Sequence, residues 1–168
     1  RGRVLDEGGA PLPGAIVSIA GHPEWGRTTS RADGFYDAAV EGGAALRIHV
    51  ERAGYLPADR AITPELTGFG AVPDVRLVAL DSQVTTISLG SSEFQVARGS
   101  TVTDVDGARR ATLIVPPGTQ AEMVLPDGTR RPLSSMAVRA TEYTVGAGGQ
   151  ARMPATLPVT SAYTYAVE

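Results

Sequence analysis

Turn-forming residues interrupt this chain too often for long helices. Gly and Pro together make up 32 of its 168 residues (20 Gly and 12 Pro), or about 19%, against about 12% in an average protein. Dipeptides that favour tight turns recur along the chain: Gly8-Gly9, Pro13-Gly14, Asp33-Gly34, Gly42-Gly43, Asp106-Gly107, Pro117-Gly118 and Asp127-Gly128. Many short segments joined by such turns predict a chain built of strands.

Several segments between these turns alternate between apolar and polar residues, as half-buried strands do. In the clearest case Leu46, Ile48 and Val50 share one face, and the polar residues between them share the other. Segment 133–145 is ambiguous, because its apolar residues also fit one face of a helix. We predict an all-β fold of two tandem antiparallel β-sandwich modules.

A boundary between the two modules is expected near Leu80. The segments before it are closely spaced among Gly and Pro. After it, a pair of strands at residues 85–89 and 94–98 begins a new set of hairpins. The predicted domains are therefore residues 1–80 and 81–168, and they share no obvious repeat.

The composition excludes several kinds of chemistry. The absence of Cys excludes disulfides, thiolate zinc sites and Cys nucleophiles. The absence of Lys excludes Schiff-base chemistry and a P-loop. With 15 basic residues, all Arg, against 18 acidic ones, the chain lacks the basic surface typical of nucleic-acid binding. No apolar run approaches the ~18 residues needed to span a membrane. We expect no cofactor, no nucleic-acid partner and no membrane insertion.

Both ends of the chain have the pattern of strands. The chain opens with Arg1-Gly2-Arg3-Val4 and closes with the alternating residues 163–168, and it shows no signal-peptide pattern. We therefore expect a segment of a larger protein.

Three motifs of the first half come in a fixed order. The first is residues 2–17, with the turn Pro11-Leu12-Pro13-Gly14; the second is residues 28–36; the third is Arg52-Ala53-Gly54-Tyr55. Together they resemble the carboxypeptidase regulatory-like domain, a seven-stranded transthyretin-like β-sandwich, over residues 1–80.

The chemistry of these motifs agrees with that resemblance. The turn that ends at Gly14 leads into an alternating strand. Asp33 and Gly34 are expected to close a hairpin, since Gly accepts a positive φ and Asp bonds to nearby backbone. Gly54 is expected to turn the backbone so that the Tyr55 ring covers the sheet edge with its hydroxyl in solvent.

The same fold also occurs in an enzyme, the hydroxyisourate hydrolase. That family has His residues near both ends and a C-terminal Tyr-Arg-Gly-Ser signature, which this sequence lacks. His22 and His49 are the only histidines, and neither has an identifiable nucleophile partner. We interpret both as solvated surface residues and predict that the chain is not an enzyme.

The second half carries a different set of motifs: residues 102–119, which end in Pro116-Pro117-Gly118-Thr119, and residues 123–129, 138–146 and 153–168. They resemble the segment upstream of the repeat shell in RHS/YD-repeat proteins, the bacterial relatives of teneurins. They are also similar to a ZU5-like β-domain, in which an apolar strand runs into Pro-Pro-Gly. The match covers residues 84–168, and no shell repeat is present. The resemblance implies a module that precedes a large β-shell enclosing a toxin or other cargo.

Other motifs of the chain carry weaker signals. Some ZU5-type proteins cleave themselves at His-Phe-Ser, which is absent here. Asp104 and Asp106 hint at a calcium loop, but a third oxygen ligand and a distal Glu do not follow at the required spacing; a simple hairpin is favoured. The pairs Arg109-Arg110 and Arg130-Arg131 flank hairpins and either hold an anion or keep the turns soluble.

Three aromatic residues are candidates for binding. Trp25 lies in a loop of Gly and Pro, where an exposed ring could stack on a sugar. Tyr163 and Tyr165 alternate with Thr164, so both rings would lie on one strand face and meet a neighbouring domain.

These observations favour a non-catalytic structural and interaction segment of a large secreted or surface-displayed bacterial RHS-type protein. Its partners would be the neighbouring domains of the same chain, and it would position or plug the adjoining shell. The alternative is a ligand-binding module for glycans or a cell-surface protein.

Overall fold

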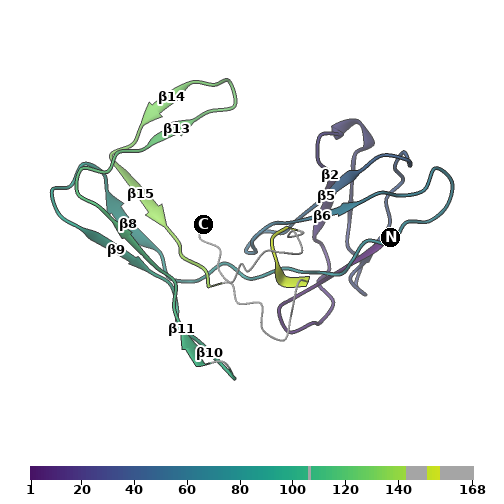
Figure 1. The fold of residues 1–168 in the computed structure, drawn as a ribbon, viewed down its shortest axis with the longest axis horizontal. Coiled ribbons are helices and arrows are strands. Elements are labelled where there is room, and N and C mark those ends of the chain that lie inside the picture. Colours follow the sequence, from purple (N-terminus) through teal and green to yellow (C-terminus); the bar gives the residue numbers. More distant parts are fainter. Residues whose placement is uncertain (106, 143–150, 156–168) are drawn as a thin grey trace. The chain divides into compact units, whose positions relative to one another are not determined.

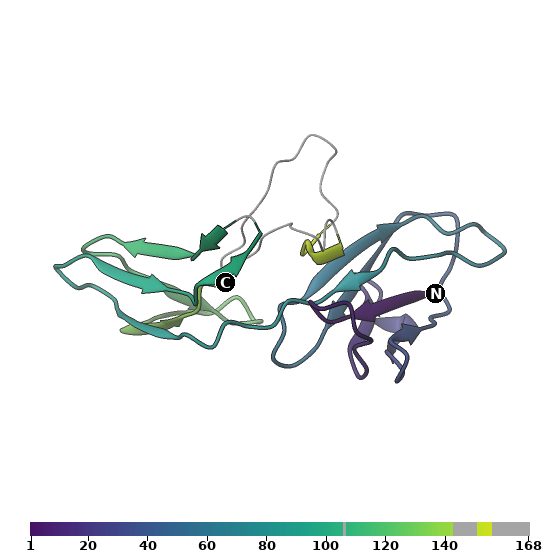
Figure 2. The ribbon, with the colours of Figure 1, turned by 90° about the horizontal axis from the view of Figure 1, so that it is seen from below.

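The computed structural model describes residues 1–105, 107–142 and 151–155. They form two compact units, one of residues 1–80 with 151–155 and the other of residues 81–142 (Figures 1 and 2). Strands joined by short turns dominate both units. The predicted all-β fold of two antiparallel sandwich modules is confirmed. Among the described residues, no helix has the length and apolar character required to cross a membrane.

The first unit contains seven strands among its described residues: β1 (Gly2–Leu5), β2 (Ile16–Ile19), β3 (Arg27–Thr29), β4 (Phe35–Tyr36), β5 (Leu46–Glu51), β6 (Ala58–Ile62) and β7 (Val75–Arg76). One sheet has the order β3-β2-β5-β6 and the other the order β4-β1-β7. All pairs are antiparallel except β1 with β7. A short 3₁₀ turn, η1 (Pro23–Trp25), lies between β2 and β3.

The core of the first unit lies between its two sheets. The alternation predicted for β5 is confirmed, since Leu46, Ile48 and Val50 are buried. Both sheets contribute to the buried cluster: Val4, Leu12, Ala15, Val17, Ile19, Tyr36, Leu46, Ile48, Val50, Ala58, Val72, Val75 and Leu77. Alternation places one face of each strand inward, so the two sheets enclose one continuous apolar layer.

The second unit contains β8 (Thr85–Ser88), β9 (Gln95–Arg98), β10 (Val102–Asp104), β11 (Gly107–Arg109), β12 (Thr112–Val115), β13 (Glu122–Val124), β14 (Arg130–Pro132) and β15 (Ser135–Val138). They pair as four two-stranded antiparallel sheets, β8–β15, β9–β12, β10–β11 and β13–β14. The first two sheets share a small core of Ile87, Ala97, Val115 and Val138. Figure 1 shows the hairpins β10–β11 and β13–β14 extending from opposite ends of this small sandwich.

The structure corrects two expectations about the second unit. The strands at residues 85–89 and 94–98 exist, but the expected pairing between them is wrong: β8 pairs with β15 and β9 with β12. The physical reason is that Ile87 and Ala97 are buried in one core, so their strands belong to two facing sheets. In segment 133–145, residues Ser135–Val138 form a strand, so the helical alternative is wrong there.

Candidate functional site

The turns predicted to shape the first unit bring their residues into tight local contact. Gly34 has a φ of +79°, and a Cβ there would lie 2.5 Å from the carbonyl oxygen of Val4. A carboxylate oxygen of Asp33 accepts a hydrogen bond from the Phe35 N–H at 3.0 Å. Gly14 and Gly54 in the same unit and Gly118 in the second unit also have positive φ, but no atom lies within 4 Å of a Cβ added there. Glycine accepts the positive φ that these turns require.

Tyr55 and Pro117 lie in the turns that the sequence indicated. Tyr55 is half-buried and forms an isolated bridge with Ala79, and the Arg52 guanidinium lies 5.7 Å from the centre of its ring. Pro117 is exposed in the turn after β12. Both residues contribute to local structure.

Trp25 is half-buried, packs against the core of the first unit and stacks on His22. The centres of the two rings are 4.0 Å apart and their planes are 5° from parallel. Nδ1 of His22 also lies 2.9 Å from a carboxylate oxygen of Glu24. Since His22 covers one face of the indole, that face offers no platform for a sugar.

His49 is held by the neighbouring strand. Its Nδ1 lies 2.7 Å from a carboxylate oxygen of Asp59 on β6, and its side chain is about one-third exposed. His49 is thus half-buried and paired, rather than a freely solvated residue. The arrangement is a cross-strand pair on the sheet's outer face, and it contains no nucleophile.

Asp104, one of the weak metal candidates, interacts with an arginine in the second unit. Arg109 donates hydrogen bonds to both of its carboxylate oxygens, and a further one, at 3.2 Å, to the buried carboxylate of Glu142. These contacts raise the pKa of Arg109. Asp106 lies outside the described residues. Within the described part of the chain, no group of three or more His, Asp or Glu side chains is placed to hold a metal ion.

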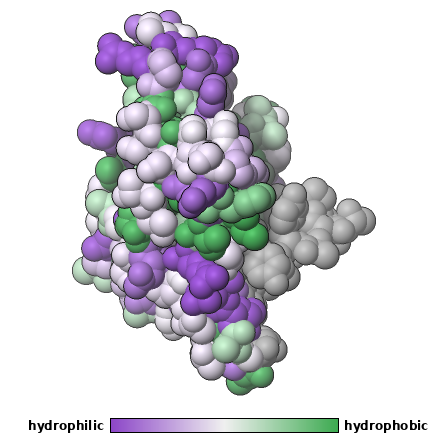
Figure 3. Space-filling view, turned by 90° about the vertical axis from the view of Figure 1, so that its left-hand side faces the viewer, coloured by the Kyte–Doolittle hydropathy of each residue, from purple (hydrophilic) through white to green (hydrophobic). Residues whose placement is uncertain are grey.

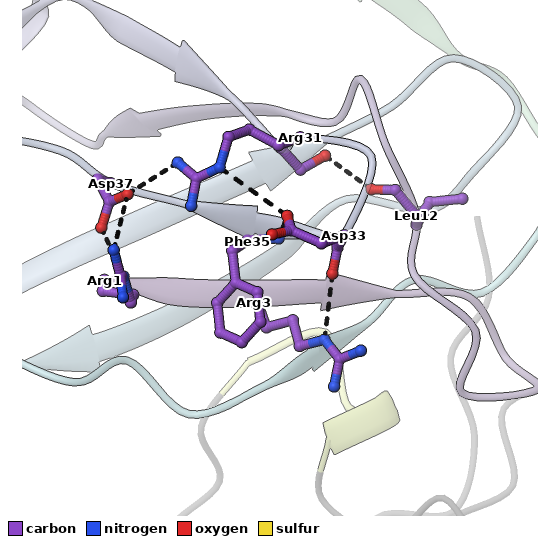
Figure 4. Close-up of polar contacts among 8 residues, drawn as sticks. Arg1, Arg3, Leu12, Arg31, Asp33, Phe35 and Asp37 are labelled. Atoms are coloured by element: carbon purple, nitrogen blue, oxygen red, sulfur yellow. Dashed lines mark hydrogen bonds and ion pairs between the residues drawn. The ribbon is translucent and has the colours of Figure 1, made fainter.

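The outer face of β1 and β4 carries a network of arginines and aspartates (Figure 4). Asp37 accepts hydrogen bonds from Arg1 at 2.8 Å and from Arg31 at 2.8 Å. These two bonds lower its pKa to about 2. Arg3 bonds to the Asp33 carbonyl, and its guanidinium lies 5.2 Å from the centre of the Phe35 ring. These arginines therefore stabilise the packing of β1 against β4 and against the turn that precedes β4.

The first unit also contains a cavity of about 490 Å³ between its sheets. Its lining includes Val17 and Ile48 from one sheet and Tyr36 from the other, and the exposed Phe69 is also part of it. Burial raises the pKa of the Tyr36 hydroxyl to about 12, and the described residues give this hydroxyl no hydrogen-bond partner. Among the described residues that line the cavity there is no His, Ser or Thr side chain.

The most distinctive surface of the second unit is the outer face of β9–β12. Val96 and Ile114 lie opposite each other in the sheet register and are 40% and 61% exposed. Phe94, two residues before Val96, is 68% exposed. We call these three residues the apolar outer face. Exposed apolar side chains grouped in this way are typical of a surface that packs against another chain segment.

The other paired sheet of the second unit has a mostly polar exterior. The exposed residues of β8 and β15 are Thr86, Ser88, Ser135 and Ala137, and Val84, two residues before Thr86, is 51% exposed. Figure 3 shows hydrophobic side chains gathered in the middle of the face it presents, between hydrophilic ones above and below. All residues of the two strands β13 and β14 are exposed, Met123 and Val124 among them. Neither face of this hairpin is covered by a second layer within the described residues.

The sequence contained a signal for the apolar outer face that alternation alone did not reveal. Leu113, Ile114 and Val115 are three consecutive apolar residues, and consecutive residues of a strand point to opposite faces. Both faces of β12 are therefore apolar. Tyr163 and Tyr165, the predicted interface residues, lie outside the described residues.

Comparison with known proteins shows that the first unit is similar to a described domain family. Residues 1–77, less than half of the chain, match the family model described as the teneurin TTR-like domain. Among curated relatives, Teneurin-3 of Danio rerio is 42% identical over 62 residues, which are 37% of this chain and 2% of the relative. Teneurin-4 of Homo sapiens is 34% identical over 62 residues, with the same coverage.

A longer match extends into the second unit. Teneurin-1 of Gallus gallus is 30% identical over 91 residues, which are 54% of this chain and 3% of the relative. The chain thus spans only about 2–3% of the length of these relatives. These findings make the first unit similar to the transthyretin-like domain of teneurins, and the chain similar to a short segment of such large proteins.

Proposed function

We propose that this chain is a non-catalytic structural and interaction segment of a large RHS/YD-repeat protein, in which it positions or plugs an adjoining β-shell. Residues 1–80 would be the transthyretin-like domain and residues 81–168 a ZU5-like module before the shell. The parent would be a secreted or surface-displayed bacterial protein that encloses a toxin or other cargo. The similarity of the first unit to the teneurin domain supports this proposal.

The observation that carries the proposal is the apolar outer face of β9–β12. Among the described residues of the second unit, the core cluster contains only four, yet Phe94, Val96 and Ile114 are exposed together. Small sandwiches bury a limited share of their surface and gain stability by packing on a neighbour. A face of this kind supports docking against another part of the parent protein.

The polar groups of both units support a role without catalysis. The two histidines and the Arg109 guanidinium make hydrogen bonds or ion pairs with nearby carboxylates. No described His lies next to a nucleophile in the way that acyl-transfer chemistry requires. The surface chemistry therefore favours contact with a partner over transformation of a substrate.

The decisive test compares Ile114→Asp with the control Thr86→Asp, which places the same charge on the polar outer face of β8–β15. Each variant is made in this segment and in the parent protein. In the segment alone, both exposed substitutions change the free energy of unfolding by no more than about 0.5 kcal/mol. In the parent, only Ile114→Asp lowers the melting temperature of the second unit and increases its cleavage by protease.

The experiment has a clear negative outcome. Equal melting temperatures and cleavage rates for the two variants in the parent would show that the apolar outer face contacts nothing there. A catalytic function would instead require turnover of a substrate that is lost on substitution of His22 or His49.

A further inference from the structure

A short segment from beyond the second unit lies against the first unit. Residues 151–155 group with residues 1–80. The Asp59 N–H on β6 donates a hydrogen bond to the Pro154 carbonyl at 2.6 Å. Arg152 forms an ion pair with Glu7 at 3.1 Å. We call residues 151–155 the strap. These contacts join parts of the chain that are more than ninety residues apart in sequence.

Arg60 provides the central contact with the strap. In the register of the sheet it lies opposite the buried Ile48, so its side chain starts from the inward face of β6. Arg60 is only 4% exposed. Its guanidinium donates hydrogen bonds to the carbonyl oxygens of Met153 at 2.9 Å and Ala151 at 2.7 Å. Burying a charged group is unfavourable unless its donors are satisfied, so the strap carbonyls stabilise this inward arginine.

The strap also covers an open edge and buries an apolar side chain. The strand β6 is the last strand in the order β3-β2-β5-β6, so one side of its backbone has no strand partner among residues 1–105, 107–142 and 151–155. Exposed edges of this kind are commonly covered by another segment. Met153 is 3% exposed, whereas Met123 on the hairpin β13–β14 is 49% exposed. The strap therefore makes a main-chain hydrogen bond to β6, supplies acceptors for the buried charge of Arg60 and carries a buried methionine.

The part of the first unit that immediately precedes residue 81 is also held by hydrogen bonds within that unit. Immediately before residue 81, the Leu80 N–H donates to the Gly54 carbonyl at 2.9 Å, and the Leu56 N–H donates to the Val78 carbonyl at 2.8 Å. The chain therefore contacts the first unit both before it enters residues 81–142 and after it leaves them.

We propose that the edge of β6 is a docking surface for the strap, and that residues 81–142 are an insertion within the fold of the first unit, tethered to it at both ends. The sandwich of the first unit is complete only when Arg60 binds the carbonyls of the returning chain. This inference goes beyond the proposed function, since it assigns residues 151–155 to the first unit rather than to a continuous module of residues 81–168. It holds whatever the second unit binds.

The first test uses amide hydrogen exchange in the unaltered chain. Asp59 and Ala61 lie two residues apart on β6, so both N–H groups point to the same free edge, and only that of Asp59 reaches the strap. We expect the Asp59 amide to exchange at least tenfold more slowly than the Ala61 amide. Equal, fast exchange of the two amides would overturn the proposal.

The second test removes the apolar anchor. Met153→Ala should raise the exchange rate of the Asp59 amide at least tenfold and lower the melting temperature of the first unit. The matched control Met123→Ala removes the same atoms from an exposed strand and should change neither quantity. An unchanged Asp59 exchange rate in Met153→Ala would overturn the docking of the strap. If that variant does not fold, Arg60→Lys, which keeps the charge but loses the planar fork, is measured in the same way with the same outcomes.

Discussion

The two units bury apolar side chains in different proportions. In the first, a four-stranded and a three-stranded sheet enclose a cluster of thirteen residues. In the second, two sheets of two strands enclose a cluster with only four members within the part of the chain that the structure describes, while Phe94 and Ile114 stay exposed. Burial of apolar surface is the main favourable contribution to folding. The first unit is therefore expected to be stable by its own core, and the second to depend on what it contacts.

The largest expected effect comes from equal truncations in the two cores. Leu77 and Ile87 are both fully buried, and replacing either residue with Ala removes about 2–5 kcal/mol of stability. We expect Ile87→Ala to unfold the second unit and Leu77→Ala to leave the first unit folded with a lower melting temperature. Amide exchange followed separately in each unit measures this. Loss of the first unit with survival of the second would reverse the comparison.

The next effect tests how tightly the first unit is packed at a turn. Gly34→Ala combines a positive φ with a Cβ 2.5 Å from the Val4 carbonyl oxygen, so we expect a loss of about 2–4 kcal/mol. Gly14→Ala is the control, because φ is +75° there but no atom lies within 4 Å of the added Cβ. It should lose only about 1 kcal/mol. Urea unfolding gives both values, and equal losses would show that the close approach has no energetic consequence.

A smaller effect concerns the acid stability of the first unit. The pKa of Asp37 is lowered to about 2 by hydrogen bonds from Arg1 and Arg31. A carboxyl group whose pKa is lower in the folded state stabilises the fold above its unfolded pKa, which is about 3.9 for Asp, and loses that contribution as pH falls toward 2. Asp37→Asn should therefore flatten the fall in melting temperature of the first unit between about pH 4 and pH 2. An unchanged pH profile would show that these ion pairs do not contribute to stability.

The smallest effect expected is that of removing calcium from the second unit. Arg109 already donates to both carboxylate oxygens of Asp104, so these oxygens are engaged without a metal. We expect the same melting temperature in calcium and in a chelator. A chelator-dependent decrease that Asp104→Asn abolishes would instead identify a metal site there.

Local features of the structure could be predicted from the sequence because they depend on neighbouring residues. The alternation of Leu46, Ile48 and Val50 gave the inward face of β5 correctly. The all-β class followed from the density of turns. The pairing of β8 and β9 was mispredicted, because two strands joined by a short turn can either pair or face each other across a core. Only the burial of Ile87 and Ala97 in one cluster distinguishes these cases.

The apolar outer face could be predicted from the sequence in part. The consecutive apolar residues at 113–115 indicate a strand with two apolar faces, but the sequence does not show which strand pairs with it. The register that places Ile114 beside Val96 supplied that information.

The sequence by itself determined where the chain turns, which residues alternate and which reactive side chains are absent, because these are properties of composition and short-range geometry. Tertiary structure alone decided that Arg60 starts from an inward strand position and binds carbonyls at residues 151 and 153. The acceptors of a buried arginine are main-chain atoms that every residue carries, so no residue type marks them. They become identifiable only when the fold brings the two segments together.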